Sequence, residues 1–139
     1  MLAVLGRVMS GSSGRDFLEV TAQSEFAGYV EHAGSAFDLR YWMIAYEDEQ
    51  PAGAVFAQRY WDKMEEGSLF IVGLVPEYRG KGLAKVIHAK GLAMLAAMGV
   101  EGYVGSTDVQ NLAMIKTFVT NGCRLTAIRN VDIGVGIVD

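Results

Sequence analysis

The sequence predicts an α/β fold of the α+β kind, with a mixed, mostly antiparallel central sheet flanked by helices. Three apolar segments rich in aromatic residues follow one another with only turns between them, as antiparallel strands do: 37–46, 52–61 and 68–75. Two segments of helical period, 82–98 and 111–120, then stand on either side of a strand-like segment at 100–107. A chain of 139 residues has the usual length of one domain, so we expect a single domain over 1–139.

Composition narrows the classes of function. Hydrophobic residues make up 51% of the chain and charged residues 20%, as in a folded protein with a real core. The formal net charge of −4 argues against a nucleic-acid binder, and no apolar run is long enough to span a membrane. One cysteine, Cys123, fits a reducing compartment. The start of the chain does not resemble a signal peptide, so we expect a cytoplasmic protein without nucleic-acid, membrane or metal partners.

The first part of the chain is expected to combine a short strand with helices. Residues 2–9 are predicted to form a strand that ends in a turn at 10–14. The segment 15–33 has helical spacing, and Ser24 is a candidate cap in its middle, so two short helices are expected there. Gly34 is the predicted stop of the second helix.

The central segments are expected to form a β-hairpin followed by a third strand. Pro51 is predicted to end the hairpin turn, and 62–67 to form the next turn. A helix joins the strand 100–107 to the strand 68–75, so these two strands are predicted to lie parallel.

The helix predicted at 82–98 has an apolar face. Gly91 is expected to allow close packing within it, and Gly99 to end it. His88 is expected to lie at the helix surface or to be half-buried.

The last helix is predicted at 111–120, between a cap at Asn111 and a stop at Gly122. Four of its apolar side chains are expected to face inward: Met114, Ile115, Phe118 and Val119. Two final strands are expected at 123–129 and 131–138.

The most informative stretch is 70–84, where a strand leads through a glycine loop into a helix. Pro76 ends the hydrogen-bond ladder of the strand, and the helix begins after Gly80 and Gly82. The first N–H groups of a helix have no partner within it, and glycine lets the main chain approach a ligand closely. Two basic residues flank the first glycine and add positive charge. This order predicts an anion-binding site.

The glycine spacing distinguishes three kinds of anion-binding loop. A Walker loop requires Ser or Thr after Gly-Lys, where this chain has Gly82. A dinucleotide-binding fingerprint requires glycine where this chain has Lys85. The third pattern, R/Q-x-x-G-x-G/A, is matched by the run Arg79-Gly80-Lys81-Gly82-Leu83-Ala84.

With the strand and the Val75-Pro76 pair before it, this run resembles the acetyl-CoA loop of the GNAT superfamily of N-acetyltransferases. The later segment also resembles a family motif, with Asn111 at the start of a helix, Phe118 within it and Gly122 at its end. The resemblance implies a central sheet splayed at the CoA site, between 68–75 and 100–107, with acetyl-CoA as cosubstrate.

The resemblance also implies which residues bind acetyl-CoA. The pantetheine arm would pair with backbone at Leu74 and Val75, and Asn111 and Phe118 would border the cosubstrate. The diphosphate would bind the N–H groups of a continuous run: Arg79, Gly80, Lys81, Gly82, Leu83 and Ala84.

One residue departs from the family pattern. Many members have tyrosine at the position of Phe118, and its hydroxyl protonates the departing CoA thiolate. Phenylalanine cannot do this, and general acid catalysis contributes about 10²–10⁴ in rate. Core packing is therefore an alternative role for Phe118. Candidates for the base that deprotonates the amine are Glu66 and Asp108, or a water held by Ser106 and Thr107.

The implied reaction is acetyl transfer from acetyl-CoA to a primary amine by direct attack, without an acyl-enzyme. The acceptor would be a small-molecule or protein amine. The missing tyrosine leaves a second hypothesis open, a catalytically weak CoA-binding sensor or regulatory module. The aromatic segments within 37–61 are a candidate face for a homodimer.

Overall fold

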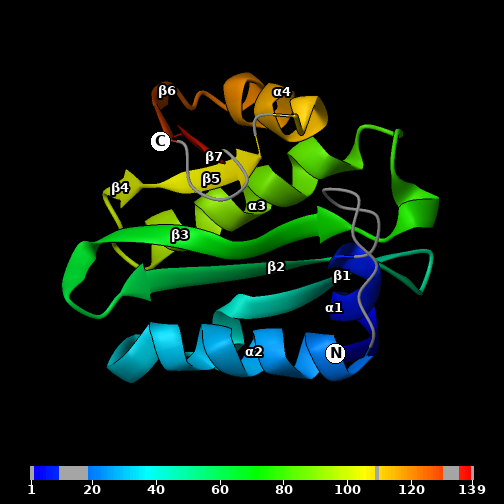
Figure 1. Cartoon of the computed structure of the whole chain (residues 1–139), viewed down its shortest axis with the longest axis horizontal. Helices are drawn as coiled ribbons and strands as arrows, with labels where there is room; N and C mark the ends of the chain where they lie inside the picture. Colours follow the sequence, from blue (N-terminus) through cyan, green and yellow to red (C-terminus); the bar gives the residue numbers. More distant parts are fainter. Residues whose placement is uncertain (1, 10–18, 109, 130–134, 139) are drawn as a thin grey trace.

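The computed structural model describes residues 2–9, 19–108, 110–129 and 135–138. Its helices and strands are, in chain order, α1 (Leu2–Met9), α2 (Glu19–Ala33), β1 (Trp42–Glu47), β2 (Gln50–Tyr60), β3 (Lys63–Leu74), α3 (Leu83–Ala97), β4 (Gly102–Tyr103), β5 (Gly105–Asp108), α4 (Leu112–Thr120), β6 (Leu125–Arg129) and β7 (Val135–Val138). The strands form two sheets, in the orders β1-β2-β3-β4 and β5-β7-β6 (Figure 1). Every pairing between described strands is antiparallel except that of β3 with β4. The predicted mixed, mostly antiparallel fold is confirmed.

The larger sheet has a helix on each face, with α2 on one side and α3 on the other (Figure 1). Neighbouring residues of β2 point to opposite faces, so Phe56 and Val55 belong to different cores. The core under α1 and α2 contains Leu5, Val8, Ala33, Trp42, Ala54, Phe56 and Val75. The core under α3 contains Val55, Ala57, Leu69, Leu74, Ile87, Met94 and Leu95.

The first eight described residues form a helix, so the prediction of a strand at 2–9 is wrong. Leu5 and Val8 are three residues apart and therefore share one helix face, where they are 0% and 5% exposed. Val8 packs so closely on β3 that a Cβ at Gly73 would lie 2.8 Å from its Cγ1. A short apolar run does not distinguish a strand from a buried helix by periodicity. The predicted turn at 10–14 lies outside the described residues.

The described part of 15–33 is one helix, α2, rather than the predicted two. Ser24 lies inside α2 and interrupts nothing. Gly34 ends the helix with a φ of +57°, a conformation that suits glycine, so its predicted role as the stop is confirmed.

The hairpin turn between β1 and β2 is formed by Asp48 and Glu49, both with positive φ (49° and 66°). The prediction that Pro51 ends the turn is wrong, because Pro51 lies within β2 opposite Tyr46. The register shifts at this point, and proline is tolerated at a bulge. The second predicted turn, 62–67, is also too long, because β3 already begins at Lys63.

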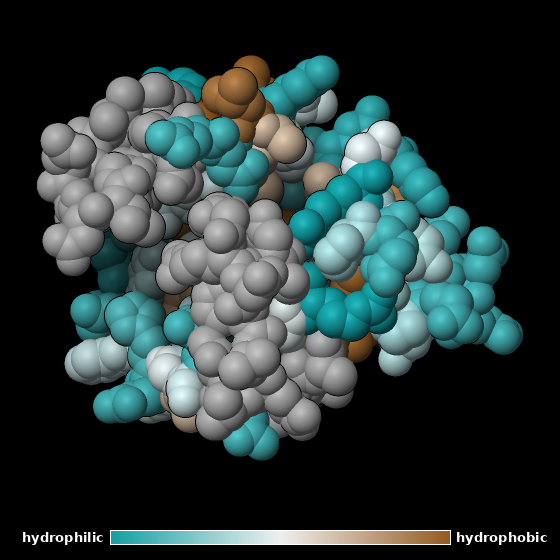
Figure 2. Space-filling model, turned by 45° about the vertical axis from the view of Figure 1, so that its right-hand side comes forward, coloured by the Kyte–Doolittle hydropathy of each residue, from teal (hydrophilic) through white to brown (hydrophobic). Residues whose placement is uncertain are grey.

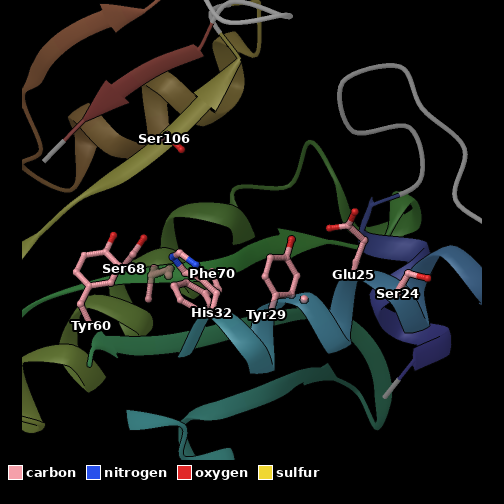
Figure 3. Close-up of a pocket in the computed structure, with 10 residues that line it drawn as sticks. Ser24, Glu25, Tyr29, His32, Tyr60, Ser68, Phe70 and Ser106 are labelled. Carbon is pink, nitrogen blue, oxygen red and sulfur yellow. The ribbon is translucent and has the colours of Figure 1, made fainter. Parts of the chain in front are cut away.

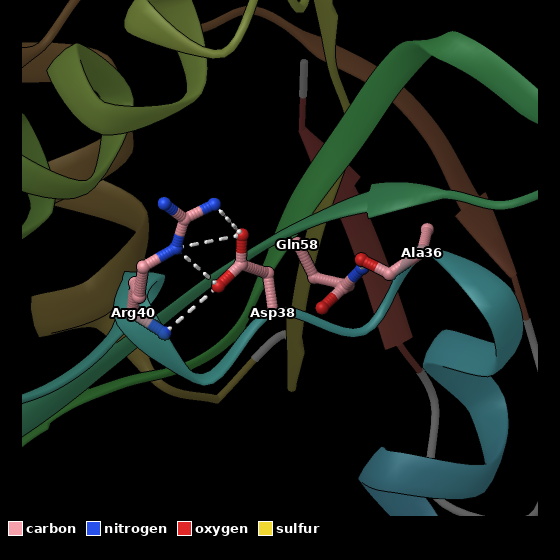
Figure 4. Close-up of polar contacts among 4 residues, drawn as sticks. All are labelled: Ala36, Asp38, Arg40 and Gln58. Carbon is pink, nitrogen blue, oxygen red and sulfur yellow. Dashed lines mark hydrogen bonds and ion pairs between the residues drawn. The ribbon is translucent and has the colours of Figure 1, made fainter.

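The link from α2 to β1 is fixed by polar contacts (Figure 4). Asp38 accepts a hydrogen bond from the backbone N–H of Arg40 at 3.0 Å and forms an ion pair with its guanidinium. Gln58 is 2% exposed, yet it accepts from Trp42 Nε1 at 3.1 Å and donates to the carbonyl of Ala36 at 2.9 Å. A buried amide without hydrogen-bond partners would destabilise the fold, so the bonds of Gln58 hold the link between α2 and β1 in one position.

Both predicted helices in the C-terminal half, α3 and α4, are confirmed, but one residue of α4 was assigned to the wrong face. A Cβ at Gly91 would lie 2.6 Å from a Leu69 methyl carbon, so Gly91 does allow α3 to pack closely on β3. The predicted stops hold: Gly99 has a φ of +88° and Gly122 a φ of +89°.

The error concerns Val119, which was predicted to face inward but is 61% exposed. Thr117 is buried in its place and bonds the carbonyl of Ala113 at 3.0 Å. Hydrophobic residues gather at the top of the view in Figure 2, where α4 lies, and α4 exposes Leu112 as well. None of the described helices is long and apolar enough to cross a membrane.

Candidate active site

The two sheets part where β4 ends. β4 pairs with β3 through only two residues, Gly102 and Tyr103, and this pairing is parallel as predicted. Val104 then donates its N–H to the carbonyl of Gly67 at 3.0 Å. From Gly105 onward the chain is β5, which pairs with β7 instead. The predicted strand 100–107 is therefore two short strands, and they leave one edge of β3 open among the described strands.

β3 also bends beside this opening. Phe56 pairs with Ile71 and Ala57 with Leu69, so Phe70 is an extra residue on β3. Such a bulge bends its strand and is common next to active sites. The splay and the bulge together produce an open strand edge that a linear ligand can follow.

The glycine loop lies at the end of β3 and leads into α3. Gly80 and Gly82 have φ values of +78° and +79°, and a Cβ at either position would meet no atom within 4 Å. Gly82 is the N-cap of α3 and provides no side-chain cap. Among the described residues, the N–H groups of Gly80, Lys81 and Gly82 donate no backbone hydrogen bond.

This loop fits an anionic ligand. The free N–H groups at a helix start carry partial positive charge, and no acidic residue lies in the first turn of α3. Leu83 and Ala84 form that first turn, so their N–H groups are also without an intrahelical acceptor. Space for a ligand is present because neither glycine has a side chain or a close neighbour.

The two basic side chains of the loop are used differently. Arg79 donates to the carbonyls of Leu74 at 3.2 Å and Val8 at 2.9 Å, so its guanidinium joins the loop to the end of α1. Lys81 lies over the ring of Tyr78, with 5.5 Å from Nζ to the ring centroid, and its side chain is exposed. The exposed charge that the loop offers to a ligand is therefore that of Lys81.

Backbone contacts define the position of the strand end next to the loop. Leu74 is the last residue of β3, and Val75 donates its N–H to the carbonyl of Ala52 at 2.8 Å. Asn111 is the N-cap of α4, and its Oδ1 accepts from the N–H of Met114 at 3.2 Å. The predicted cap is confirmed.

A cluster of three polar side chains, His88, Tyr103 and Asn121, connects α3, β4 and the end of α4. His88 is 0% exposed, so the expectation of a surface or half-buried residue is wrong. Its Nε2 lies 3.2 Å from Tyr103 Oη, and its Nδ1 lies 2.8 Å from Asn121 Nδ2. The ring of Phe118 packs edge-on against His88, with 5.1 Å between centroids, and Phe118 is 1% exposed.

These contacts define the tautomer of His88. Asn121 Nδ2 also bonds the carbonyl of Lys85 at 3.0 Å, which requires a nitrogen rather than an oxygen at that position. The amide therefore donates to His88 Nδ1, and the ring proton lies on Nε2. His88 then donates to Tyr103 Oη. Burial lowers the pKa of His88 to about 4, so the ring is neutral near pH 7.

A pocket of about 500 Å³ lies between α2, β3 and β5 (Figure 3). Its lining is mixed aromatic and polar: Ser24, Glu25, Gly28, Tyr29, His32, Tyr60, Ser68, Leu69, Phe70 and Ser106. Figure 3 shows the polar ends of Tyr29, Tyr60 and Glu25 pointing toward the side on which β5 lies. The volume suits a small organic ligand or the end of a peptide.

Comparison with known proteins agrees with this arrangement. Residues 13–122 match the family described as Acetyltransferase (GNAT) family. The chain belongs to this family. A GNAT fold explains the splayed sheet, and the resemblance noted from the glycine loop is confirmed.

The individual relatives share only about a third of their residues with this chain over the matched region. A mycothiol acetyltransferase of Mycobacteroides abscessus is 33% identical over 85 residues, which is 59% of this chain and 28% of that protein. The chain thus spans about a quarter of the length of the mycothiol acetyltransferases that it matches.

Solved GNAT structures share the fold. The ribosomal-protein-S18-alanine N-acetyltransferase of Escherichia coli superposes with a TM-score of 0.70 at 16% identity, covering 99% of this chain and 84% of that chain. An acetyltransferase of Bacillus anthracis, solved in complex with acetyl coenzyme A, gives a TM-score of 0.59 at 17% identity, covering 68% of this chain and 58% of that chain.

The two carboxylates predicted as GNAT bases differ in position. Glu66 lies where β3 still pairs with β4, and it forms an ion pair with Lys63 at 2.9 Å. The backbone of Asp108 pairs with Val135 at the end of β5, but its side chain lies outside the described part of the structure. Ser106 lines the pocket, on the β5 side of the opening.

Nothing in the sequence singles out Tyr103. Tyr103 stands in a strand-like run, and its hydroxyl becomes notable only when His88 and Asn121 surround it. Asn121 is the C-cap of α4, and its side-chain amide also donates to the carbonyl of Lys85 and to His88.

Protonation of His88 should make the domain less stable in acid. The folded pKa of about 4 lies below the ordinary value of 6.5, so between these pH values the unfolded chain binds more protons and stability falls as the pH falls. From pH 7 to pH 5 the loss should be about 2 kcal/mol. Urea denaturation of the wild type and of His88→Gln measures it, and the variant should lose clearly less. An equal loss in both would contradict the account of His88.

Proposed function

We propose that this chain is an N-acetyltransferase that transfers the acetyl group of acetyl-CoA to a primary amine by direct attack. The observation that carries the proposal is the position of the glycine loop. Its free N–H groups lie at the end of the open edge of β3, so one extended cosubstrate can contact both. GNAT membership supports acetyl-CoA as the cosubstrate.

Acetyl-CoA binding is assigned to the residues of the loop and the strand end. The N–H groups of the run from Gly80 to Ala84 bind the diphosphate, assisted by the exposed ammonium of Lys81, whereas the N–H of Arg79 already donates to the carbonyl of Pro76. The backbone of Leu74 is assigned to the pantetheine arm, as an added strand would pair, whereas the predicted pairing at Val75 is not available because its N–H donates to Ala52 and its carbonyl accepts from Tyr78. Asn111, at the start of α4, borders the thioester, whereas Phe118 is 1% exposed and packs in the core against His88 and Tyr103.

The acceptor amine is assigned to the pocket between α2, β3 and β5. Glu25 supplies a carboxylate and Tyr29 an aromatic face, and both attract an ammonium group. The hydroxyls of Ser68 and Ser106 lie on the two strands that part, so they flank the path between acceptor and thioester. This chemistry favours a cationic small molecule or the amino end of a peptide.

The chemistry needs no covalent enzyme intermediate. The amine loses a proton, its nitrogen attacks the thioester carbon, and the C–S bond breaks with its electron pair leaving on sulfur. Strand N–H groups at the open edge of β3 can stabilise the developing oxyanion. Glu66, Asp108, or a water held by Ser106 and Thr107 remains the proposed route for the proton of the amine.

Turnover on an amine panel tests the proposal. We expect thiol release from acetyl-CoA that depends on an added amine, for at least one member of a panel of polyamines, aminoglycosides and short peptides with free N-termini. The product should be the acetylated amine by mass spectrometry. CoA binding without turnover on any amine would instead support the second candidate, a CoA-binding sensor, which the absence of a hydroxyl at Phe118 favours.

A further inference from the structure

The polar cluster of His88, Tyr103 and Asn121 lies where β3 and β5 begin to separate, and its position bears on how the leaving thiolate is stabilised. Acetyl transfer from a thioester leaves negative charge on sulfur, and a hydrogen-bond donor near that sulfur lowers the barrier. Phe118 is buried and has no donor. A donor to the sulfur of a CoA molecule bound along the open edge of β3 would therefore have to come from another residue, close to the point where β3 and β5 separate.

Tyr103 lies at that point. It is the last residue of β4, and β5 begins two residues later at Gly105. A Cβ at Gly105 would come within 2.3 Å of Tyr103 Oη, so the hydroxyl lies directly against the first residue of the diverging strand. Phe118 packs beside it, with 6.4 Å between ring centroids.

The hydroxyl of Tyr103 is also oriented to donate. Asn121 donates to His88 Nδ1, so the ring proton is on Nε2 and His88 donates to Tyr103 Oη. Because one lone pair of Oη accepts this hydrogen bond, the hydroxyl hydrogen of Tyr103 points away from His88 and is available to a ligand. Burial raises the pKa of Tyr103 above its ordinary value, so the hydroxyl keeps its proton and acts as a donor rather than as an anion. Among the described residues, His88 is the hydrogen-bond partner of Oη.

We propose that Tyr103 donates a hydrogen bond to the sulfur of CoA and stabilises the thiolate that leaves in acetyl transfer. His88 and Asn121 are positioning residues that hold the hydroxyl in place. Tyr103 keeps its proton throughout: the electron pair of the broken C–S bond remains on sulfur, and the thiolate is protonated from solvent while the amine releases its proton. This inference rests on the proposed function, because it requires CoA at the open edge of β3.

The test compares CoA with desulfo-CoA, which lacks the thiol. Calorimetric titrations at pH 7 and pH 9.5 measure both affinities for the wild type and for Tyr103→Phe. An ordinary thiol ionises near pH 8.5, so at pH 9.5 CoA is offered mainly as the thiolate. A charge-assisted hydrogen bond should then favour CoA over desulfo-CoA by about tenfold in the wild type, and this preference should be absent in Tyr103→Phe.

Other titrating groups do not obscure this comparison. His88, Cys123 and Tyr60 face Tyr103 from α3, from the chain after α4, and from β2, and all three are unchanged in Tyr103→Phe. Tyr46→Phe is the matched control, because Tyr46 is 63% exposed on β1, and it should behave as the wild type. In acetyl transfer, Tyr103→Phe should lower kcat by about 10²-fold with little change in KM for acetyl-CoA.

The outcomes separate the two proposals. Failure of the wild type to bind either ligand overturns the proposed function and this inference with it. Binding with the same CoA preference in the wild type and Tyr103→Phe overturns this inference alone. Should Tyr103→Phe fail to fold, His88→Gln and His88→Leu replace it: only the glutamine can donate to Tyr103 Oη, so only that variant should keep the thiolate preference. Equal behaviour of these two variants overturns the inference.

Discussion

Gly82→Glu should abolish CoA binding while the domain still folds. Gly82 has a φ of +79° and caps α3 without a side chain, so a glutamate there forces the loop from its conformation. It also places a carboxylate where the loop offers N–H groups to a diphosphate. We expect affinity to fall by at least about 10²-fold, because strain and charge repulsion act together. Calorimetric titration with CoA measures the loss.

Gly99→Glu provides the matched control for this change. Gly99 ends the same helix with a φ of +88°, and a Cβ there also meets no atom within 4 Å. Strain and added charge are therefore the same, but they lie at the opposite end of α3. Affinity close to that of the wild type is expected for Gly99→Glu. A similar loss in both variants would show that general destabilisation, rather than the loop, explains the effect.

Among the glycines whose surroundings the structure describes, Gly53 is where a single methyl addition, Gly53→Ala, should cause the largest loss of stability. A Cβ at Gly53 would lie 2.2 Å from the carbonyl oxygen of Gly73, a backbone atom that no rotamer change can move. β2 and β3 must therefore separate at the pair Gly53–Leu74, which includes the residue assigned to pantetheine. We expect a cost of about 3 kcal/mol, which corresponds to a melting temperature lower by about 10 °C.

Gly28→Ala is the opposite control. Gly28 lies inside α2, and a Cβ there meets no atom within 4 Å. Alanine is a better helix former than glycine, so this variant should be more stable by about 0.5–1 kcal/mol. A melting temperature for Gly53→Ala that is as high as that of Gly28→Ala would contradict the close approach of β2 and β3.

The sequence predicted most of the fold, because its strong signals are local. Gly34, Gly99 and Gly122 each end a helix with positive φ, and such stops can be recognised from residue type alone. The α1 helix and the position of Pro51 were mispredicted for a different reason. Tertiary packing decides these positions: Leu5 and Val8 bury against the sheet, and a bulge accommodates the proline.

The sequence indicates a candidate site only where one continuous run carries its features. The run from Arg79 to Ala84 can be recognised because glycine spacing and basic charge lie together in sequence. Arg79 shows the limit of this reading, because its guanidinium bonds Leu74 and Val8 within the protein. Tyr103, His88 and Asn121 come from three separate elements, so no spacing in the sequence reveals that their side chains meet.

The most direct test of the central claim is an amide NMR titration of the protein with CoA. The account predicts that the backbone N–H signals of the run from Gly80 to Ala84 shift first and furthest, because these groups donate to the diphosphate. Signals around Gly99, at the other end of α3, should stay in place. Shifts that cluster elsewhere, with the loop signals unmoved at saturation, would show that the glycine loop does not bind the cosubstrate.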